Sequence, residues 1–332
     1  MQVAWSGELA GRAIDQWTRE IPVIAERGEI TDRNGELLAG NATKYTVFAR
    51  SNAVKNAENT AKKLSETLGV PYEAVLKKLT GKKASEVTVA KKTEKEAVQK
   101  LAGLSLNGVY FSRDNERTYP KSDFLSQVIG FTSSDNTGAA GIEKYYDSFL
   151  RGKDGEILYE TDLVGLRLNG AAGAYKPAEN GYNLRLTIDS GIQTIAETAL
   201  KRAAQQYNPK SAECIVLDPD TFEILAMACT PSYDLNNVPR DDIPLLNTLS
   251  RNRIVCDIYE PGSTFKVITS AADLEEWKKG NKAAFSPTHV FSSSRTRTVD
   301  GTTVKCWSNH ANGKHSCQTL ADALNNSCNP CF

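Results

Sequence analysis

Residues 54–104 have apolar positions at helical spacing among many Ala, Lys and Glu residues. Gly69-Val70-Pro71 and Gly81 interrupt this spacing, and such residues commonly end helices. The pattern therefore predicts three short amphipathic helices, with a strand at residues 87–90 before the last of them.

Segments with strand-like spacing flank this helical region. Residues 29–31 and 45–49 precede it, and the Asn34-Gly35 pair between them favours a turn that joins antiparallel strands. Residues 108–120 return to strand-like spacing. Two further helices are predicted after them, at residues 122–129 and 139–150.

The stretch from residue 151 to residue 181 is rich in Gly, Asn and Ala, and it includes Gly170-Ala171-Ala172-Gly173. Such a composition is typical of a linker or a surface hairpin. We therefore predict two domains, residues 1–175 and residues 176–332.

The second predicted domain mixes strands and helices. Residues 182–188 alternate as a strand, and residues 190–207 form a helical pattern. The apolar face of that helix is expected at Ile192, Ile195, Ala199 and Ala203. Two strands follow, at 214–217 and 223–228, and the turn sequence Asp218-Pro219-Asp220 suits an antiparallel hairpin. The predicted fold class is α+β.

Charge and composition exclude several classes of protein. The 332 residues contain 40 Lys and Arg against 40 Asp and Glu, so the chain lacks the basic excess of proteins that bind nucleic acid without sequence preference. No nucleic-acid partner is expected. No stretch approaches the 18 consecutive apolar residues of a membrane-spanning helix. The chain as it stands is expected to be soluble, although a membrane anchor ahead of Met1 would not be visible in it.

Ser263 and Lys266 are the strongest candidates for chemistry. Pro261-Gly262 predicts a turn, and residues 263–277 continue as a largely apolar helix that we expect to be central and buried. Ser263 and Lys266 share one face of its first turn, so Oγ can lie within hydrogen-bond reach of Nζ. Burial and the positive end of the helix dipole favour the neutral amine, which can accept the hydroxyl proton.

A Ser-x-x-Lys pattern also occurs by chance in a chain of this composition. The competing interpretation is a partly exposed serine beside a lysine whose ammonium group reaches solvent. The turn before the pattern and the apolar helix after it favour nucleophilic catalysis.

The segment YEPGSTFK, residues 259–266, resembles the active-site motif of penicillin-binding proteins. The chain is also similar to the class B members, and most of all to the sporulation-type and division enzymes. The matching segments, in order, are RGEITDRNG at 27–35, RTYP at 117–120, GIEKYYDSFLRGKDG at 141–155, LTIDSGIQTIAETAL at 186–200 and IVLDPDTFEILAMACTPSYDLN at 215–236.

The family's second motif is Ser-x-Asn, and four strings in the chain fit it. They begin at Ser105, Ser134, Ser250 and Ser327. Ser134-Asp135-Asn136 is the most literal copy, but it precedes Ser263 and lies in the first predicted domain, so we interpret it as a decoy. Only Ser327-Cys328-Asn329 follows the nucleophile. The resemblance implies that Ser327 relays a proton and that Asn329 orients the substrate and Lys266.

The family's third motif, Lys-(Ser/Thr)-Gly on a strand beside the cleft, is not found in the sequence. The nearest string, Lys278-Lys279-Gly280, is expected to end a helix. By resemblance, the chain has an N-terminal pedestal (dimerisation-type) domain followed by an incomplete penicillin-binding transpeptidase domain, with an antiparallel sheet and helices.

The resemblance also implies a two-step acyl transfer on peptidoglycan stem peptides that end in D-Ala-D-Ala. Ser263 would form the acyl-enzyme, and β-lactams would acylate the same serine. No cofactor and no metal is implied. The expected location is the outer face of a bacterial cell membrane, where the pedestal would contact membrane partners of cell-wall synthesis.

The cysteines all follow residue 213. Cys328 lies inside the Ser-x-Asn motif, and Cys331 follows at Cys-x-x-Cys spacing. A zinc site is one interpretation by ligand type, built from Cys306, His310, His315, Cys317 and the later pair. Inert buried thiols are another. A third interpretation is a redox-sensitive site among Cys306, Cys317, Cys328 and Cys331, because the family lies outside the cytosol and a disulfide there would affect Ser327.

Two other classes of function remain open. One is a non-enzymatic scaffold or sensor that keeps the fold and binds β-lactams. The other is a hydrolase, either a D,D-carboxypeptidase or a β-lactamase. The lifetime of the acyl-enzyme distinguishes these classes.

Overall fold

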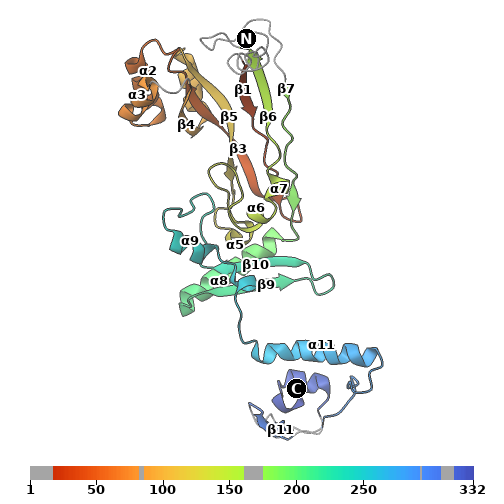
Figure 1. Cartoon of the computed structure of the whole chain (residues 1–332). Coiled ribbons are helices and arrows are strands. Elements are labelled where there is room, and N and C mark those ends of the chain that lie inside the picture. Colours follow the sequence, from red (N-terminus) through yellow and green to blue (C-terminus); the bar gives the residue numbers. More distant parts are fainter. Residues whose placement is uncertain (1–17, 82–85, 161–174, 292–293, 308–317) are drawn as a thin grey trace, which may run out of the picture. The chain divides into compact units, whose positions relative to one another are not determined.

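Figure 1 shows the computed structural model of the chain, which describes residues 18–81, 86–160, 175–291, 294–307 and 318–332. The chain forms two compact units, Met1–Cys256 and Asp257–Phe332. The predicted domain boundary at residues 175 and 176 lies inside the first unit. The predicted boundary separates two domains of the family that the sequence resembles, and such domains need not coincide with compact units. It therefore stays a prediction.

The first unit is built on the long strand β3 (Leu37–Ala49). On one side β3 pairs antiparallel with β5 (Val109–Thr118), and on the other with β4 (Val87–Thr93). The short strand β2 (Ile30–Thr31) also pairs with β3, and β8 (Leu184–Arg185) runs parallel to β2. The strands predicted in this region are therefore confirmed, although β8 is shorter than the predicted strand at 182–188.

Helices α2 (Ala57–Leu68), α3 (Tyr72–Thr80) and α4 (Lys95–Gly103) confirm the three predicted amphipathic helices. The side chain of Asn56 accepts a hydrogen bond from the Asn59 amide at the start of α2, and Gly69 ends that helix with φ 68°. The helices bury their apolar faces against the sheet. The buried members of this cluster are Val47, Ala49, Ala61, Leu64, Val75, Leu79, Val89 and Leu101.

The next helices are shorter than their hydrophobic pattern predicts. The predicted helix 122–129 is reduced to α5 (Ser126–Ile129) because Ser122 and Leu125 adopt left-handed conformations, with φ 50° and 54°. The predicted helix 139–150 is divided into α6 (Gly141–Tyr145) and α7 (Asp147–Leu150). Periodicity identified these segments, but backbone turns set their ends.

Part of the predicted linker or hairpin forms a small sheet. In it, β6 (Gly155–Glu160) lies between β1 (Thr18–Val23) and β7 (Tyr175–Lys176), and both pairings are antiparallel. The Gly-Ala-Ala-Gly string at 170–173 lies outside the described residues.

Helix α8 (Ser190–Tyr207) coincides with its predicted range. It packs against the antiparallel pair formed by β9 (Ala212–Leu217) and β10 (Ile224–Thr230), which confirms the predicted hairpin. The carboxylate of Asp189 accepts hydrogen bonds from the first amides of α8 and so caps the helix.

The predicted apolar face of α8 is partly wrong. Ile195 is 72% exposed, whereas Gln193 is fully buried. The Gln193 amide group accepts a hydrogen bond from the Met227 N–H (2.7 Å) and donates one to the Met227 carbonyl (3.1 Å). These two bonds satisfy the buried amide, so a polar side chain occupies the helix–sheet interface.

A second cluster of buried side chains in the first unit contains residues from Ile30 to Leu246. It involves α9 (Ile243–Ser250), which is followed by α10 (Arg253–Cys256). The buried members are Ile30, Leu38, Ala39, Tyr119, Phe124, Leu125, Ile129, Phe131, Leu150, Ile188, Tyr233, Leu235 and Leu246. Segments on both sides of residue 176 therefore share one core.

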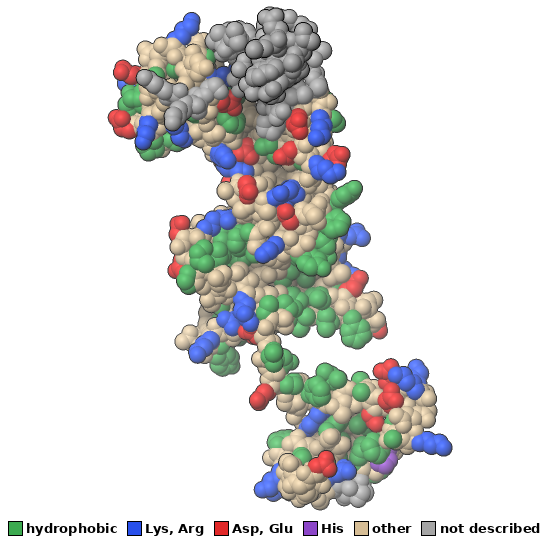
Figure 2. All heavy atoms as spheres, in the orientation of Figure 1, with side chains coloured by type: hydrophobic (Ala, Val, Ile, Leu, Met, Phe, Trp, Pro, Cys, Tyr) green, Lys and Arg blue, Asp and Glu red, His purple; other side chains and the backbone are tan. Residues whose placement is uncertain are grey.

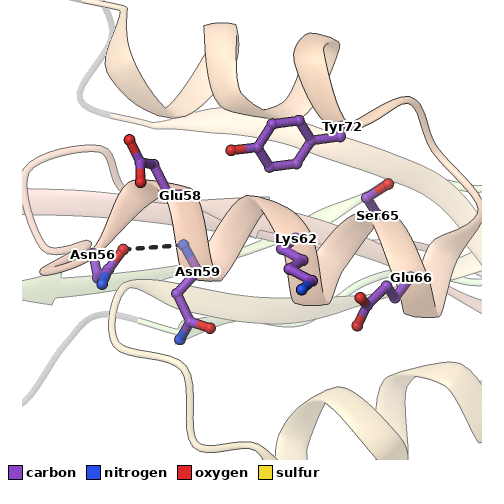
Figure 3. A pocket seen from close by; sticks show the side chains of 7 residues that line it. All are labelled: Asn56, Glu58, Asn59, Lys62, Ser65, Glu66 and Tyr72. Carbon is purple, nitrogen blue, oxygen red and sulfur yellow. Dashed lines mark hydrogen bonds between the residues drawn. The ribbon is translucent and has the colours of Figure 1, made fainter.

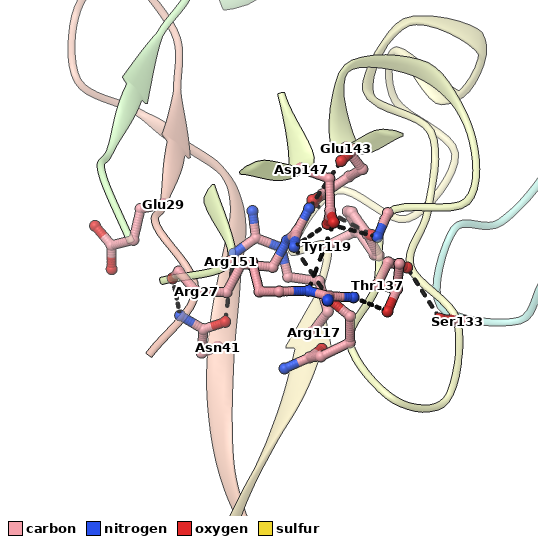
Figure 4. A network of polar contacts seen from close by, with 12 residues as sticks. Arg27, Glu29, Asn41, Arg117, Tyr119, Ser133, Thr137, Glu143, Asp147 and Arg151 are labelled. Atoms are coloured by element: carbon pink, nitrogen blue, oxygen red, sulfur yellow. Dashed lines mark hydrogen bonds and ion pairs between the residues drawn. The ribbon is translucent and has the colours of Figure 1, made fainter. Parts of the chain in front are cut away.

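A buried ionic network holds three of the family-like segments together (Figure 4). The Glu143 carboxylate is fully buried and contacts Arg27 Nε (2.7 Å) and Arg117 Nε (2.6 Å). Arg27 also pairs with Asp147 (2.7 Å), and Asn41 donates to the Arg27 carbonyl (2.6 Å). Buried charges need such pairing, so this network fixes how residues 27–35, 117–120 and 141–155 meet.

The second unit begins with a helix and a β-hairpin. A 3₁₀ turn, η1 (Gly262–Thr264), leads into α11 (Phe265–Lys278). The strands β11 (Thr296–Val299) and β12 (Thr302–Lys305) form a hairpin, whose turn residues Asp300 and Gly301 both have positive φ.

The second unit ends in α12 (Leu320–Asn325) and the 3₁₀ turn η3 (Asn329–Cys331). Thr319 and Asp322 form a reciprocal capping box at the start of α12. This cap fixes where the helix begins.

Helix α11 differs from the expectation that it is central and buried. Its buried residues are Lys266 and Ser270, whereas Phe265, Val267 and Ile268 are more than half exposed. The face that carries Lys266 is therefore the buried one, and part of the apolar surface of the helix is open among the described residues. On the visible surfaces of both units, Lys and Arg side chains are interspersed with Asp and Glu (Figure 2), as the neutral net charge suggests.

Candidate functional site

Ser263 and Lys266 lie where the chain turns into α11. Gly262 has φ 56°, which glycine adopts without steric cost, and Ser263 follows in the 3₁₀ turn. Ser263 is exposed, whereas Lys266, one turn later, is only 9% exposed. The sequence therefore places an accessible hydroxyl beside a buried amine.

The Ser-x-Asn segment follows α12 and contacts the buried amine directly. Lys266 Nζ donates hydrogen bonds to the Ser327 carbonyl (2.8 Å), to Ser327 Oγ (3.1 Å) and to Asn329 Oδ1 (2.7 Å). Ser327 Oγ in turn lies 2.9 Å from Ser263 Oγ. The structure thus brings together all four predicted site residues within the second unit.

The hydrogen-bonded path between Ser263 and Lys266 differs from the expected direct contact. In the described part of the chain, no hydrogen bond joins Ser263 Oγ to Lys266 Nζ, and Ser327 Oγ bridges the two groups. Ser327 has φ 50°, which directs both its carbonyl and its hydroxyl towards Lys266. A left-handed non-glycine residue costs about 1–2 kcal/mol, so neighbouring contacts must hold it in place.

Burial lowers the pKa of Lys266 below its usual value, while Cys306, Cys328 and Cys331 act in the opposite direction. The Phe332 ring, 5.5 Å from Nζ, also favours the charged form. The three hydrogen bonds donated by Nζ are those of an ammonium group. After losing one proton, the amine has a lone pair that can accept the proton of Ser327.

The cysteines around the motif form a small buried cluster with Ala323. Cys328 is fully buried and Cys306 is 4% exposed, with their sulfur atoms 4.0 Å apart in a thiol hydrogen bond. Burial, with a smaller contribution from Cys331, raises the pKa of the Cys328 thiol to about 11. Cys317 and the two histidines of the zinc interpretation lie outside the described residues.

Among the residues that the structure describes, no group of three or more His, Cys, Asp or Glu side chains is arranged to hold a metal ion. The zinc interpretation therefore gains no support from the part of the chain in view. Three of its ligands, His310, His315 and Cys317, lie outside that part.

The literal copy of the second motif, Ser134-Asp135-Asn136, lies in the first unit. It occupies a turn in which Ser133 Oγ donates to the Asp135 carboxylate and to the Thr137 carbonyl. The motif residues Ser134, Asp135 and Asn136 border a cavity of about 310 Å³ together with Lys91 and Lys92. No Ser-x-x-Lys pair lines this cavity, so its lining lacks the serine–lysine arrangement found around Ser263.

Another hollow, of about 600 Å³, lies beside α2 and α3 (Figure 3). It is lined by Asn56, Glu58, Asn59, Lys62, Ser65, Glu66 and Tyr72. Asn56 and Asn59 are joined there by the helix-capping hydrogen bond (3.0 Å). Ser65 Oγ in this lining donates to the Val70 carbonyl (2.7 Å) and is not paired with a base.

Sequence reasoning missed two residues that contact the Ser-x-Asn loop. Asn329 Nδ2 donates to the Lys305 carbonyl (2.9 Å), and Trp307 Nε1 donates to the Asn326 carbonyl (3.1 Å). The only sequence signal is that both flank Cys306, because the contacts depend on how the hairpin folds against the loop.

Two known protein families match successive parts of the chain. The family described as penicillin-binding protein dimerisation domain matches residues 22–186, and the penicillin-binding protein transpeptidase domain matches residues 213–332. The order of these matches agrees with the predicted pedestal and transpeptidase domains. Together, these matches define a penicillin-binding protein with a dimerisation domain followed by a transpeptidase domain. The chain belongs to the class B penicillin-binding proteins.

Curated relatives agree with this family. Stage V sporulation protein D of Bacillus subtilis is 38% identical over 100% of this chain and 50% of its own length. Peptidoglycan D,D-transpeptidase FtsI of Escherichia coli is 29% identical over 76% of this chain and 43% of its own length. The chain thus spans about half the length of these relatives.

A solved structure supports the fold. A peptidoglycan synthetase from Bifidobacterium adolescentis has a TM-score of 0.67 at 26% identity, over 94% of this chain and 59% of that one. A search of the described helices finds none that is long and apolar enough to cross a membrane.

Proposed function

We propose that this protein is a serine D,D-transpeptidase that crosslinks peptidoglycan stem peptides through an acyl-enzyme at Ser263. The observation that carries the proposal is the hydrogen-bonded series Ser263 Oγ, Ser327 Oγ and Lys266 Nζ. A serine needs a base to become a nucleophile, and this series provides one at the end of a two-step relay. The family and its relatives supply the substrate class.

Acylation begins with Lys266 neutral, when both hydroxyls reverse their donor direction. Ser263 Oγ bonds to the carbonyl carbon of the penultimate D-alanine, its proton passes to Ser327 Oγ, and the Ser327 proton passes to Lys266 Nζ. Backbone amides of the first turn are available to stabilise the oxyanion. The carbon–nitrogen bond then breaks, and the proton returns along the relay to the departing D-alanine amine.

The second step reverses the first with a new amine. An amino group of a neighbouring stem peptide attacks the ester carbonyl, and its proton passes through Ser327 towards Lys266. The carbon–oxygen bond to Ser263 breaks, and Ser263 recovers its proton. A β-lactam follows only the first step, because its amine leaving group stays attached to the acyl group.

A labelled penicillin tests this proposal. Covalent labelling of the chain should be lost in Ser263→Ala and retained in Ser134→Ala, which alters the literal copy of the second motif. Equal labelling of the Ser263→Ala variant would contradict the proposal. The lifetime of the label separates the alternatives, since rapid release would indicate a β-lactamase or other hydrolase. Growth or sporulation supported by Ser263→Ala in cells would indicate a scaffold or sensor.

The relatives suggest the setting. We propose that the protein acts on the outer face of the cytoplasmic membrane, in division or sporulation, and that its pedestal domain contacts membrane partners. The structure of a complex between a Helicobacter pylori penicillin-binding protein and MreC has a TM-score of 0.67 at 22% identity, over 92% of this chain and 60% of that one. That likeness concerns the fold alone.

We also infer that the site responds to redox conditions through Cys306 and Cys328. Their sulfur atoms lie 4.0 Å apart, and a disulfide needs about 2.05 Å. A disulfide oxidant such as oxidised glutathione would take two electrons and two protons from the thiols and become two thiols itself. The new bond would alter the loop between Asn326 and Asn329, which carries Ser327.

The redox proposal is tested by comparing penicillin acylation rates after oxidised glutathione and after dithiothreitol. We expect different rates for the wild-type chain and equal rates for Cys328→Ser. Because the pKa of Cys328 is about 11, oxidation should quicken as pH rises towards that value. Identical rates in both conditions for the wild type would refute the proposal.

A further inference from the structure

Residues 305–307 run beside the loop that carries the Ser-x-Asn motif, and successive residues each contact it. The Lys305 carbonyl accepts from Asn329 Nδ2 (2.9 Å). The Cys306 sulfur lies 4.0 Å from that of Cys328, and Trp307 Nε1 donates to the Asn326 carbonyl (3.1 Å). We call residues 305–307 the brace. Its contacts fall on both sides of Ser327.

Ser327 is the residue in this loop that most needs external support. Its φ of 50° is unfavourable for a residue with a Cβ atom. Its carbonyl and hydroxyl supply two of the three oxygen atoms that hold Lys266 Nζ. A small rotation of the loop would therefore remove Ser327 from both Ser263 and Lys266.

The contacts of the brace differ in kind. The Lys305 contact uses a backbone carbonyl, which is present whatever side chain stands there. The Cys306–Cys328 contact is a thiol hydrogen bond, and such bonds are weak. The Trp307 indole N–H is a full-strength donor, and it holds the residue immediately before Ser327.

We propose that Trp307 is a positioning residue, whose indole N–H holds Asn326 so that Ser327 stays in its left-handed conformation against Lys266. The exposure of the ring supports this role, because 69% of Trp307 is open to solvent. A ring so exposed contributes little core packing, and its indole N–H donates to the motif loop. The effect of Trp307 on acylation rests on the proposed function, whereas its effect on the conformation of Ser327 does not.

The test measures how well Lys266 is protected, without requiring catalysis. The full chain is treated with sulfo-N-hydroxysuccinimide acetate, and acetylation of Lys266 is followed by peptide mass spectrometry relative to the exposed Lys282. Trp307→Phe keeps an aromatic ring but removes the donor. We expect Lys266 to be acetylated about fivefold faster in this variant, the change that corresponds to the loss of one neutral hydrogen bond.

Trp277→Phe is the matched control. Trp277 lies in α11 of the same unit and is 45% exposed, and its indole makes no hydrogen bond with the described residues. We expect this variant to match the wild type. Asn329→Ala removes one Lys266 contact directly and should also accelerate acetylation, which shows that the assay detects loosening.

Equal acetylation of Lys266 in wild type and Trp307→Phe, with acceleration in Asn329→Ala, would overturn the proposal. If Trp307→Phe lacks a cooperative thermal transition, benzothienylalanine at position 307 replaces it, since that residue keeps the ring shape and exchanges the N–H for sulfur. Acceleration with an unchanged melting temperature supports positioning. Acylation of Ser263 by labelled penicillin is measured separately, so failure of the proposed function leaves this result interpretable.

Discussion

At the residue scale, the charge of Lys266 controls the proposed chemistry. The ammonium form donates three hydrogen bonds and cannot accept a proton, so only the neutral amine can start acylation. Burial lowers the pKa of Lys266 below its ordinary value. The neutral fraction at a given pH is therefore larger than for a solvated lysine.

The first prediction concerns pH. The rate of penicillin acylation should rise as pH increases through the pKa of Lys266, and the midpoint should lie below the 10.5 of an ordinary lysine. The sign follows because the reactive form is the deprotonated one. Stopped-flow measurement across the alkaline range checks it. A rate that falls with rising pH, or a midpoint at or above 10.5, would contradict the role of Lys266.

Lys266→Arg is the second prediction at this scale. Arginine keeps the charge and the donors but cannot lose its proton in this range. Acylation should fall by about 10²-fold or more, and the alkaline rise should disappear. Thermal melting of the variant shows whether the site still folds. A variant that melts like the wild type and reacts at an unchanged rate would exclude Lys266 as the base.

The four site residues could be predicted from motif and order along the chain, but their connection could not. Spacing placed Ser263 and Lys266 on one face of a turn, while the bridge through Ser327 depends on a left-handed backbone at the end of α12. Trp307 was missed for a similar reason. Nothing in the sequence states which carbonyl an exposed indole will meet.

At the element scale, the junction of three segments at Glu143 has the clearest energetic consequence. The Glu143 carboxylate is shared by Arg27 and Arg117, and all three side chains are almost entirely buried. Glu143→Gln removes the charge with little change of shape and leaves two buried guanidinium groups short of a partner. We expect a loss of about 3–5 kcal/mol in the free energy of unfolding.

Urea unfolding followed by circular dichroism measures this loss. Glu179→Gln serves as the control, because Glu179 pairs with Lys153 at an exposed position where solvent screens the interaction. That variant should unfold near the wild-type midpoint. A Glu143→Gln midpoint equal to that of the control would show that the network does not stabilise the first unit.

Element types followed from periodicity more reliably than element ends or faces. Helix α8 matched its predicted range because a capping aspartate and a long helical pattern agree. Helix α5 was shortened by positive φ at Ser122 and Leu125, residues for which sequence gives no such signal. The buried face of α8 was misjudged because Gln193 satisfies its amide group on the β10 backbone.

At the scale of the whole molecule, the family matches and the site agree on one class of protein. The two matched domains occur in the predicted order, and the serine, lysine and Ser-x-Asn residues all fall inside the transpeptidase match at 213–332. The balanced charge of 40 basic and 40 acidic residues suits a peptide substrate better than a polyanion. The compact units of the structure meet at a different place along the chain from the family matches, after Cys256. The reason is that the core of the first unit includes residues up to Leu246.

The proposed function depends above all on Ser263 acting as the nucleophile. Its most direct test is to incubate the chain with benzylpenicillin, digest it and locate the added mass by peptide mapping. We expect one penicilloyl group on the peptide that contains Ser263, and its absence when Ser327 is replaced by alanine under the same short incubation. A penicilloyl group on another residue, or a folded chain that gains none at Ser263, would contradict it.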